Sequence, residues 1–172
     1  LKPSISALKQ FPEIEYTLRE HKYGDIDWAD LIIKNPAIKP DNEFLTYAQK
    51  NGKKIETDMG IFLEYVKPSQ IIGVTGTKGK STTSSLIYEV LSGIGRHRKF
   101  SQVIIAGNIG KSVLEIIPQI KPDSLIVLEI SSFQLESFET YQVSPKWAVV
   151  TNILPDHLNY YQNMDYYINA KK

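Results

Sequence analysis

Residues 70–82 are Gln70-Ile71-Ile72-Gly73-Val74-Thr75-Gly76-Thr77-Lys78-Gly79-Lys80-Ser81-Thr82. The first six residues have the composition of a buried strand, a glycine-rich turn follows them at once, and residues 80–91 have apolar positions at helical spacing. We expect that helix to lie on a sheet through one face, which carries Leu86, Ile87, Val90 and Leu91. A strand, a glycine-rich turn and a helix in direct succession are typical of a phosphate-binding loop in an α/β protein.

Each residue type in this turn suits the binding of a nucleotide's phosphates. Glycines let the backbone turn with its N–H groups pointing inward around phosphate oxygens. The new helix adds its positive amino end, Lys80 supplies a cation for the β- and γ-phosphates, and the Ser81 hydroxyl can ligate Mg²⁺. The spacing departs from the standard loop because Val74 stands five positions before Gly79, so a plain strand-to-helix turn remains the alternative. The predicted ATP-binding residues are Gly76, Thr77, Lys78, Gly79, Lys80, Ser81 and Thr82.

The chain on both sides of this loop alternates between strand-like and helix-like segments. Upstream, Asp41 or Asn42 can cap a helix that Asn51-Gly52 ends, and Pro36 ends the strand before it. The expected strands are residues 30–34, 54–57, 70–75, 103–106, 125–129 and 146–151, with a helical turn at 61–66. Near-continuous apolar strands with helical crossovers predict an α/β fold with a mostly parallel sheet that is covered on both faces. Functional loops should then lie at the carboxyl ends of the strands.

The composition excludes several classes of protein. With 172 residues, 42% of them hydrophobic, the chain can bury a core in one or two domains. A formal net charge of +1 argues against a nucleic-acid partner, and we interpret the short basic run at residues 96–99 as a solvated turn. There are no cysteines, no apolar stretch of membrane-spanning length and no signal-peptide core, so we expect a cytoplasmic protein. A first residue other than Met, and a last residue inside a helical pattern, suggest a fragment.

A resemblance to a known family starts from the turn. Gly76-Thr77-Lys78-Gly79-Lys80-Ser81 resembles the Gly-Thr-x-Gly-Lys-Ser/Thr loop of the Mur ligase superfamily, whose members include the folylpolyglutamate synthases and make amide bonds through acyl phosphates. Three later segments are similar to the same superfamily: Gly107-Asn108-Ile109-Gly110, Leu128-Glu129-Ile130-Ser131-Ser132-Phe133-Gln134-Leu135-Glu136 and Thr151-Asn152-Ile153-Leu154-Pro155-Asp156-His157-Leu158. Ser131 to Glu136 most resembles the branch that adds D-glutamate to UDP-N-acetylmuramoyl-L-alanine. The resemblance covers roughly Asp30 to the end.

For the fold, the resemblance implies an incomplete Rossmann-like N-terminal domain at residues 1–68 and a truncated P-loop central domain at residues 69–172, with Pro68 at the boundary. For the function, it implies a ligase of peptidoglycan synthesis that uses ATP and Mg²⁺ and takes a UDP-sugar-peptide and D-glutamate. Such an enzyme is expected to be a cytoplasmic monomer that serves cell-wall biogenesis, cell shape and cell division. Because the N-terminal domain's first strand and the later domains are not found, the chain alone should not turn over.

The resemblance assigns catalytic roles to Lys80, His157 and Lys171. Glu129 ends an apolar strand, where a carboxylate can reach a site at the sheet edge and bind a hard cation through oxygen, although a solvated strand-end charge is the alternative. By resemblance, Ser81, Glu129 and His157 are the Mg²⁺ ligands, and Asp156 orients the loop that carries His157.

Tyr167-Ile168-Asn169-Ala170-Lys171 resembles a family segment whose lysine reacts with CO₂ to form a carbamate near the metal. Carbamylation requires a neutral amine, hence a lysine whose pKa is lowered by burial or by nearby cations. Lys172 next door is a second candidate, and a plain surface lysine is the alternative. A truncated end is expected to lose the environment that lowers the pKa.

The resemblance also implies a substrate site. Asn35-Pro36-Ala37-Ile38 is similar to a loop that cradles the UDP diphosphate through backbone N–H groups, and an ordinary strand end is the alternative. Asn108 can offer amide donors and acceptors to the sugar-peptide, with Ser131, Ser132 and Phe133 in the same cleft; a turn and a strand end are the alternatives. We expect the aromatic residues Tyr160, Tyr161, Tyr166 and Tyr167 to pack the last helix.

Two other functions remain open from the sequence. Another Mur-type step, or folylpolyglutamate synthesis, would keep the chemistry and change the substrate. A non-catalytic nucleotide-binding module would use the loop as a switch, and it would place Glu129 and His157 far from the loop.

Overall fold

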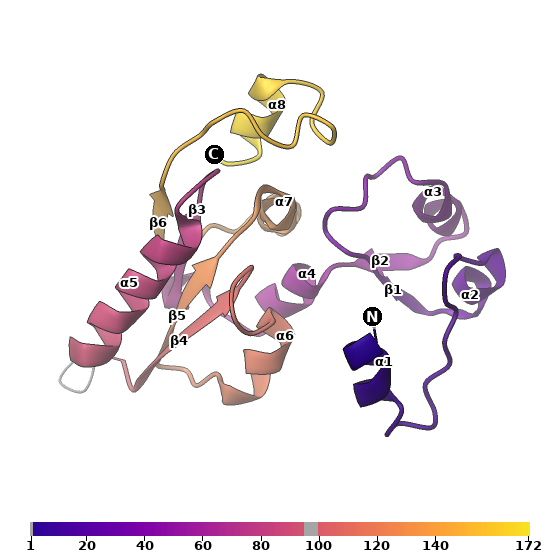
Figure 1. Ribbon diagram of the computed structural model, residues 1–172, viewed down its shortest axis with the longest axis horizontal. Coiled ribbons are helices and arrows are strands. Elements are labelled where there is room, and N and C mark those ends of the chain that lie inside the picture. Colours follow the sequence, from indigo (N-terminus) through magenta and orange to yellow (C-terminus); the bar gives the residue numbers. More distant parts are fainter. Residues whose placement is uncertain (1, 95–99) are drawn as a thin grey trace. The chain divides into compact units, whose positions relative to one another are not determined.

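The computed structural model describes residues 2–94 and 100–172 and divides them into two compact units (Figure 1). The first unit comprises residues 1–32 and 40–55, and the second comprises residues 33–39 and 56–172. The basic run predicted as a solvated turn lies outside the described residues. Across the ranges that are described, no helix is both long and apolar enough to cross a membrane.

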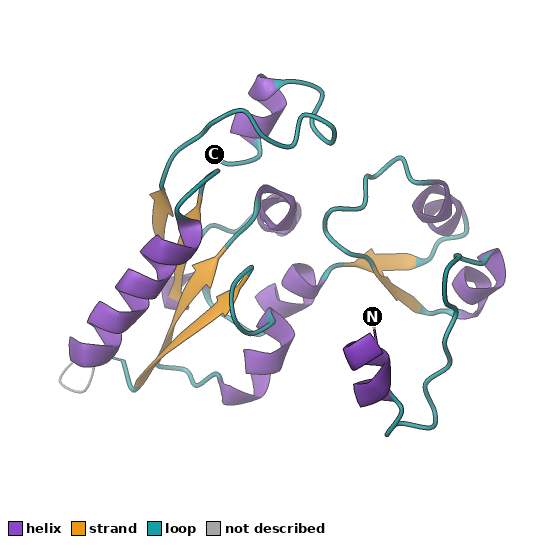
Figure 2. Cartoon of the chain, viewed as in Figure 1, coloured by secondary structure: helices purple, strands orange, loops and turns teal. Residues whose placement is uncertain are grey.

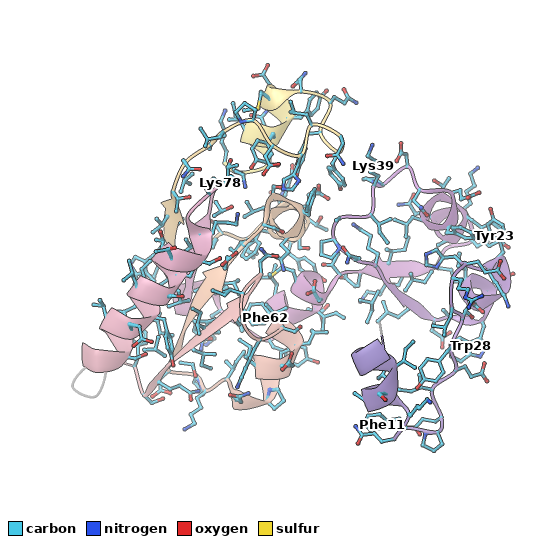
Figure 3. The ribbon with its side chains drawn as sticks, in the orientation of Figure 1. Phe11, Tyr23, Trp28, Lys39, Phe62 and Lys78 are labelled. Atoms are coloured by element: carbon cyan, nitrogen blue, oxygen red, sulfur yellow. The ribbon has the colours of Figure 1, made fainter. Side chains whose placement is uncertain are left out.

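The first unit is built around three short helices: α1 (Lys2–Leu8), α2 (Tyr23–Trp28) and α3 (Glu43–Lys50). As predicted, α3 begins after Asn42, whose side-chain oxygen accepts hydrogen bonds from the next backbone N–H groups, and it ends at Asn51. Trp28 at the end of α2 is 85% exposed (Figure 3).

A two-stranded sheet pairs β1 (Leu31–Ile33) with β2 (Lys54–Glu56). The sequence predicted a buried strand at β1, and this is wrong: Leu31 is 42% exposed and Ile33 is 53% exposed. The physical reason is that β1 has one neighbouring strand, so a short apolar run there is not enclosed as it would be inside a larger sheet.

The second unit contains a four-stranded sheet in the order β4-β5-β3-β6, and every pairing in it is parallel (Figure 2). The predicted α/β fold with a mostly parallel sheet is confirmed. Its elements are α4 (Asp58–Leu63), β3 (Ile71–Thr75), α5 (Lys80–Ile94), β4 (Gln102–Gly107), α6 (Val113–Ile116), β5 (Ser124–Glu129), α7 (Ser132–Thr140), β6 (Trp147–Val150) and α8 (Met164–Asn169), with 3₁₀ turns at Pro68–Gln70 and Ile117–Gln119.

The core of this unit lies between the sheet and the helices α4, α6 and α7. All six residues of β5 are buried. Met59 and Phe62 of α4 are 0% exposed and pack in the core; Figure 3 labels Phe62. The second unit takes in residues 33–39 and the chain from Glu56 onward, so the expected boundary at Pro68 falls inside it, because α4 packs against α6 and α7.

Helix α5 packs along β3, β4 and β5, but through a different face from the one predicted. Leu86 is 62% exposed and Val90 is 56% exposed, whereas Ser84 is fully buried. Residues 84, 87, 88 and 91 form the covered side, which is rotated from the predicted face by about one residue, or roughly 100°. Apolar spacing found the helix and missed its orientation, because a small buried serine carries no hydrophobic signal.

Since the four strands are parallel, their carboxyl ends meet at one edge of the sheet. The segments that leave this edge are the loop after β3, the turn after β4, the start of α7 after β5, and residues 151–163 after β6. These four segments contain most of the residues that the sequence marked as functional.

Candidate functional site

The loop between β3 and α5 depends on two glycines with positive φ angles. Gly76 has φ +139° and Gly79 has φ +79°, in the region that favours glycine. A Cβ atom on Gly76 would collide with Thr151 Oγ1 and with the backbone of Asn152. The glycine thus lets the loop after β3 lie directly against the turn after β6.

Asn152 holds the first half of the loop through three hydrogen bonds. Its carbonyl accepts from Thr77 N at 2.9 Å, its Oδ1 accepts from Lys78 N at 2.9 Å, and its Nδ2 donates to Lys78 O at 3.0 Å. Thr151 Oγ1 also donates to Lys78 O, at 2.6 Å. The N–H groups of Thr77 and Lys78 are therefore used by the protein, and the N–H groups that remain for phosphate oxygens are those of Gly79 onward, at the start of α5.

The Thr77 side chain also has structural contacts. Its hydroxyl accepts from Leu154 N at 2.9 Å, donates to Leu154 O at 3.1 Å, and lies 3.0 Å from the hydroxyl of Tyr167. The sequence predicted that Thr77 belongs to the ATP loop, and the geometry shows how that loop is joined to α8 and to the segment before His157.

Lys80 folds over the loop that precedes it. Its Nζ donates to Gly76 O at 2.9 Å and to Thr77 O at 3.1 Å. The ammonium group therefore lies above the amino end of α5, where positive charge from the helix is also concentrated. Both features favour a bound anion at this position.

Lys171 is 7% exposed, and its amine reaches the same loop. Its Nζ donates to Thr75 Oγ1 at 3.3 Å. Burial, reinforced by the positive charge of Lys80 and opposed by Asp156, lowers the pKa of Lys171 to about 8. The expectation that a truncated end would lose this environment is wrong, because β3, the loop and Tyr167 already enclose the amine.

Glu129 lies at the end of β5 and is 2% exposed. Its Oε1 accepts from Asn108 Nδ2 at 3.1 Å, and its backbone oxygen accepts from Asn108 N at 2.9 Å. Its Oε2 is buried without a hydrogen-bond partner. A solvated strand-end charge is thereby excluded, and an unpaired buried carboxylate oxygen fits a hard cation, which prefers oxygen ligands.

The turn that carries His157 is held by its own backbone. His157 has φ +53°, and its carbonyl accepts from the N–H groups of Tyr160 and Tyr161 at 2.9 Å each. Asp156 Oδ1 accepts from His157 N at 2.9 Å, and Asp156 Oδ2 lies 3.7 Å from His157 Nε2. Asp156 thus holds the backbone of this turn through His157 N, and its role in orienting the loop stays a prediction.

Aromatic rings pack against this turn. The His157 ring lies 4.8 Å from the Phe133 ring, and Tyr161 and Tyr167 are 7% and 1% exposed. The prediction that the aromatic cluster packs the last helix is confirmed for these two tyrosines, and Tyr160 donates to both oxygens of Glu136 at 3.0 and 3.2 Å. The packing prediction is wrong for Tyr166, whose side chain is 54% exposed.

The turn at residues 35–38 uses its own hydrogen-bonding groups. Asn35 Oδ1 accepts from Ala37 N at 2.9 Å, and Asn35 O accepts from Ile38 N at 3.0 Å. Lys34 Nζ donates to Pro36 O and Ile38 O at 3.3 Å each, and burial lowers the pKa of Lys34 while Glu136 opposes this shift. Because Pro36 has no N–H, the backbone cradle expected for a diphosphate is reduced to Asn35.

One cavity of about 480 Å³ brings these segments together, and all of its lining residues belong to the second unit. The predicted residues that line it are Asn35, Pro36, Gly76, Thr77, Lys80, Asn108, Ser131, Ser132, Phe133, His157 and Lys171. Those absent from its wall are Lys78, Gly79, Ser81, Thr82 and Glu129. Glu129 lies directly behind the wall, through its hydrogen bond to Asn108.

Other cavity residues were not named as site residues: Ala37, Gly107, Gln134 and Tyr167 lie inside family-like segments, whereas Asp58 and Ser112 do not. Tyr167 had a usable signal, since it belongs to the quoted segment that ends at Lys171. Gln134 is explained by the capping box at the start of α7, where its Oε1 accepts from Ser131 N and its own N–H donates to Ser131 Oγ. Asp58 follows a short strand in a segment with no motif, so nothing in the sequence marked it.

Over residues 2–94 and 100–172, no cluster of three or more His, Asp and Glu side chains is arranged to hold a metal ion. A cation near Glu129 and His157 would therefore take further ligands from a hydroxyl group, a bound phosphate or water.

The sequence of this chain is similar to those of several known proteins. A model of the Mur ligase middle domain matches residues 74–172. The UDP-N-acetylmuramoylalanine–D-glutamate ligase of Borreliella burgdorferi (strain ZS7) is 43% identical over 169 residues, which are 98% of this chain and 35% of that protein. The ligases of the same name from Roseiflexus sp. (strain RS-1) and Treponema pallidum are 41% and 34% identical and align with all of this chain, over 35% and 34% of their own length. The chain thus spans about a third of the length of the curated relatives it matches.

Proposed function

This chain belongs to the Mur ligase family, and we propose that it is part of an ATP-dependent ligase that adds D-glutamate to UDP-N-acetylmuramoyl-L-alanine in peptidoglycan synthesis. One observation carries the proposal: a single cavity is lined by Lys80, His157 and Lys171, each of which the sequence marked as catalytic. The substrate in this proposal is taken from the names of the relatives, and the proposed roles of the side chains are supported by the residues that line the cavity.

We assign the binding of the two substrates to different parts of the chain. In this proposal residues 69–172 belong to a P-loop central domain that binds ATP, and residues 1–68 belong to a Rossmann-like N-terminal domain that binds the UDP-substrate, with residues 33–39 and 56–68 of the latter packed into the second compact unit. Asn35, Pro36 and Asn108 contact the substrate, with Ser131, Ser132 and Phe133 in the same wall. The complete enzyme would work in the cytoplasm as a monomer, and this chain alone would not turn over.

The reaction begins when the L-alanyl carboxylate of the UDP-substrate attacks the γ-phosphate of ATP, which gives an acyl phosphate and ADP. The amine of D-glutamate then attacks the acyl carbon, and the tetrahedral intermediate collapses to the amide and phosphate. Such phosphoryl transfer depends mainly on positioning and charge neutralisation. Lys80 and the amino end of α5 provide both, because they bring positive charge to one end of the cavity.

Magnesium is expected in this site, where it would neutralise phosphate charge. Glu129 is the strongest candidate ligand because its buried Oε2 has no other partner, and His157 and Ser81 are the further candidates. In the same cavity as His157, the neutral amine of Lys171 would add to CO₂ and release a proton, so that a carbamate replaces the amine. The lowered pKa of Lys171 supports this step, because it raises the fraction of neutral amine near neutral pH.

The test is release of ADP from the complete ligase that contains this chain. The enzyme should release ADP with UDP-N-acetylmuramoyl-L-alanine plus D-glutamate, and not with a folate plus L-glutamate. ADP release with the folate pair alone would transfer the proposal to a folylpolyglutamate synthase. No stimulation by any acceptor would leave a nucleotide-binding module.

A further inference from the structure

Residues 151–154, which follow β6, are hydrogen-bonded to the end of β3 and the loop that follows it. Thr151 N donates to Thr75 O at 3.0 Å, Thr77 N donates to Asn152 O at 2.9 Å, and Leu154 N donates to Thr77 Oγ1 at 2.9 Å. These bonds continue the parallel pairing of β3 with β6 beyond the ends of both strands. The loop and the turn therefore form one hydrogen-bonded unit.

Within this turn, Asn152 forms hydrogen bonds to both backbone groups of one loop residue, Lys78. Its side chain accepts from the N–H of Lys78 and donates to the C=O of Lys78. A side-chain amide does both through two separate atoms, whereas a carboxylate has no donor. The grip fixes the peptide immediately before Gly79, where the backbone turns toward α5.

The same turn leads directly to the catalytic histidine. His157 lies five positions after Asn152, and the pair of bonds between Leu154 and Thr77 anchors the middle of this stretch. Thr77 also meets Tyr167, whose ring lies 4.9 Å from the amine of Lys171. Displacement of the loop would therefore shift His157 and Lys171 relative to Lys80.

We propose that Asn152 is a positioning residue of the nucleotide site: by holding the peptide of Lys78, it aims the N–H groups from Gly79 onward, and Lys80, at the phosphates. This proposal rests on the proposed function for its nucleotide, and it assigns Asn152 no contact with ATP. Its action is indirect, because its oxygen and nitrogen are already engaged by Lys78.

The experiment compares variants of the complete ligase by calorimetric titration with ADP. Asn152→Ala removes both side-chain bonds and should weaken ADP binding about ten-fold, because Lys78 N loses its partner and Lys78 O keeps only Thr151 Oγ1. Asn152→Asp keeps the acceptor for Lys78 N and sets a negative charge against Lys78 O, so it should weaken ADP binding at least as much. The matched control is Asn159→Ala, an exposed asparagine in the same segment, which should bind ADP within about two-fold of wild type.

Steady-state kinetics of the same variants separate positioning from a general structural role. Positioning raises KM for ATP about ten-fold in Asn152→Ala and leaves KM for the UDP-substrate within about two-fold. Equal increases in both KM values, together with a lower midpoint of thermal unfolding, would overturn the proposal. So would unchanged ADP affinity in Asn152→Ala.

If Asn152→Ala does not fold, Thr151→Val serves instead. It removes the second donor to Lys78 O and should weaken ADP binding about three-fold, and wild-type affinity in this variant would contradict the proposal. Failure of the proposed function is distinguishable, because a wild-type enzyme that binds ADP and does not add D-glutamate leaves the ADP affinities of the variants intact as a test.

Discussion

The amine of Lys171 lies over the ring of Tyr167, 4.9 Å from its centre. The hydroxyl of that ring is 3.0 Å from Thr77 Oγ1, so α8 is joined to the loop after β3 through one tyrosine. A lysine in contact with an aromatic face, a threonine hydroxyl and the backbone has little water around it, which is why its charged form is disfavoured.

The pH dependence of stability should report this lysine. Because the pKa of Lys171 is about 8 in the folded state and near 10.5 in the unfolded state, the unfolded state binds more protons between these pH values, so this residue adds stability as pH rises from 8 toward 10.5. The urea midpoint of the wild-type protein should therefore rise across this range relative to Lys171→Met. Parallel pH profiles of the two proteins would contradict the assigned pKa.

Lys80 and Lys78 should differ sharply in their effect on turnover. Lys80→Ala should lower kcat of the complete ligase about 100-fold or more, because it removes a preorganised positive charge at the transferred phosphoryl group. Lys78→Ala should have a much smaller effect, since Lys78 contributes its backbone to the loop while its side chain is exposed (Figure 3). Steady-state ADP release measures both, and near-normal turnover by Lys80→Ala would refute the assignment of the loop.

Gly76 should not tolerate a side chain. Gly76→Ala would force a Cβ atom against Thr151 and Asn152 at a φ of +139°, and we expect a loss of about 1–3 kcal/mol in the free energy of unfolding together with loss of ADP binding. Gly93→Ala is the matched control, because open space surrounds Gly93 on α5, where alanine should stabilise by about 0.5–1 kcal/mol. Denaturant unfolding of both variants measures the difference.

The buried carboxylate of Glu129 should lower the thermal stability of the protein most when no metal is bound. Glu129→Gln keeps an acceptor for Asn108 and removes a buried charge, so its thermal midpoint without Mg²⁺ should be no lower than that of the wild type. Added Mg²⁺ should raise the midpoint of the wild type and leave the variant unchanged. An equal Mg²⁺ effect on both proteins would remove Glu129 from the metal site.

The sequence predicted this site well where a residue type has a single backbone task. Gly76 and Gly79 were recognisable because a left-handed turn before a helix needs glycine; outside the site, the cap of α3 was narrowed to Asp41 or Asn42 because a side-chain oxygen must accept from its first N–H groups. The parallel sheet followed from the apolar strands. Such local rules hold whatever the rest of the chain does.

What the sequence could not predict depends on partners far along the chain. Asn152 showed no sign of gripping Lys78, because the pattern of a segment does not reveal which loop it will meet. The exposure of Leu86 has the same origin, since the orientation of a helix is set by the surface it packs on. The turn at Asn35 was expected to offer its N–H groups to a ligand, but two of them, those of Ala37 and Ile38, donate to Asn35 within the turn.

The bond between Lys78 and Asn152 joins residues that are 74 positions apart in the chain. Contacts of such long range form late in folding, since the entropy of closing the intervening loop must be overcome first. During synthesis, β3 and the loop after it leave the ribosome well before Asn152, which holds that loop, has been added to the chain. We therefore expect the capacity to bind a nucleotide to appear only when the second unit is almost fully assembled, so that ATP selects finished molecules over partly folded ones.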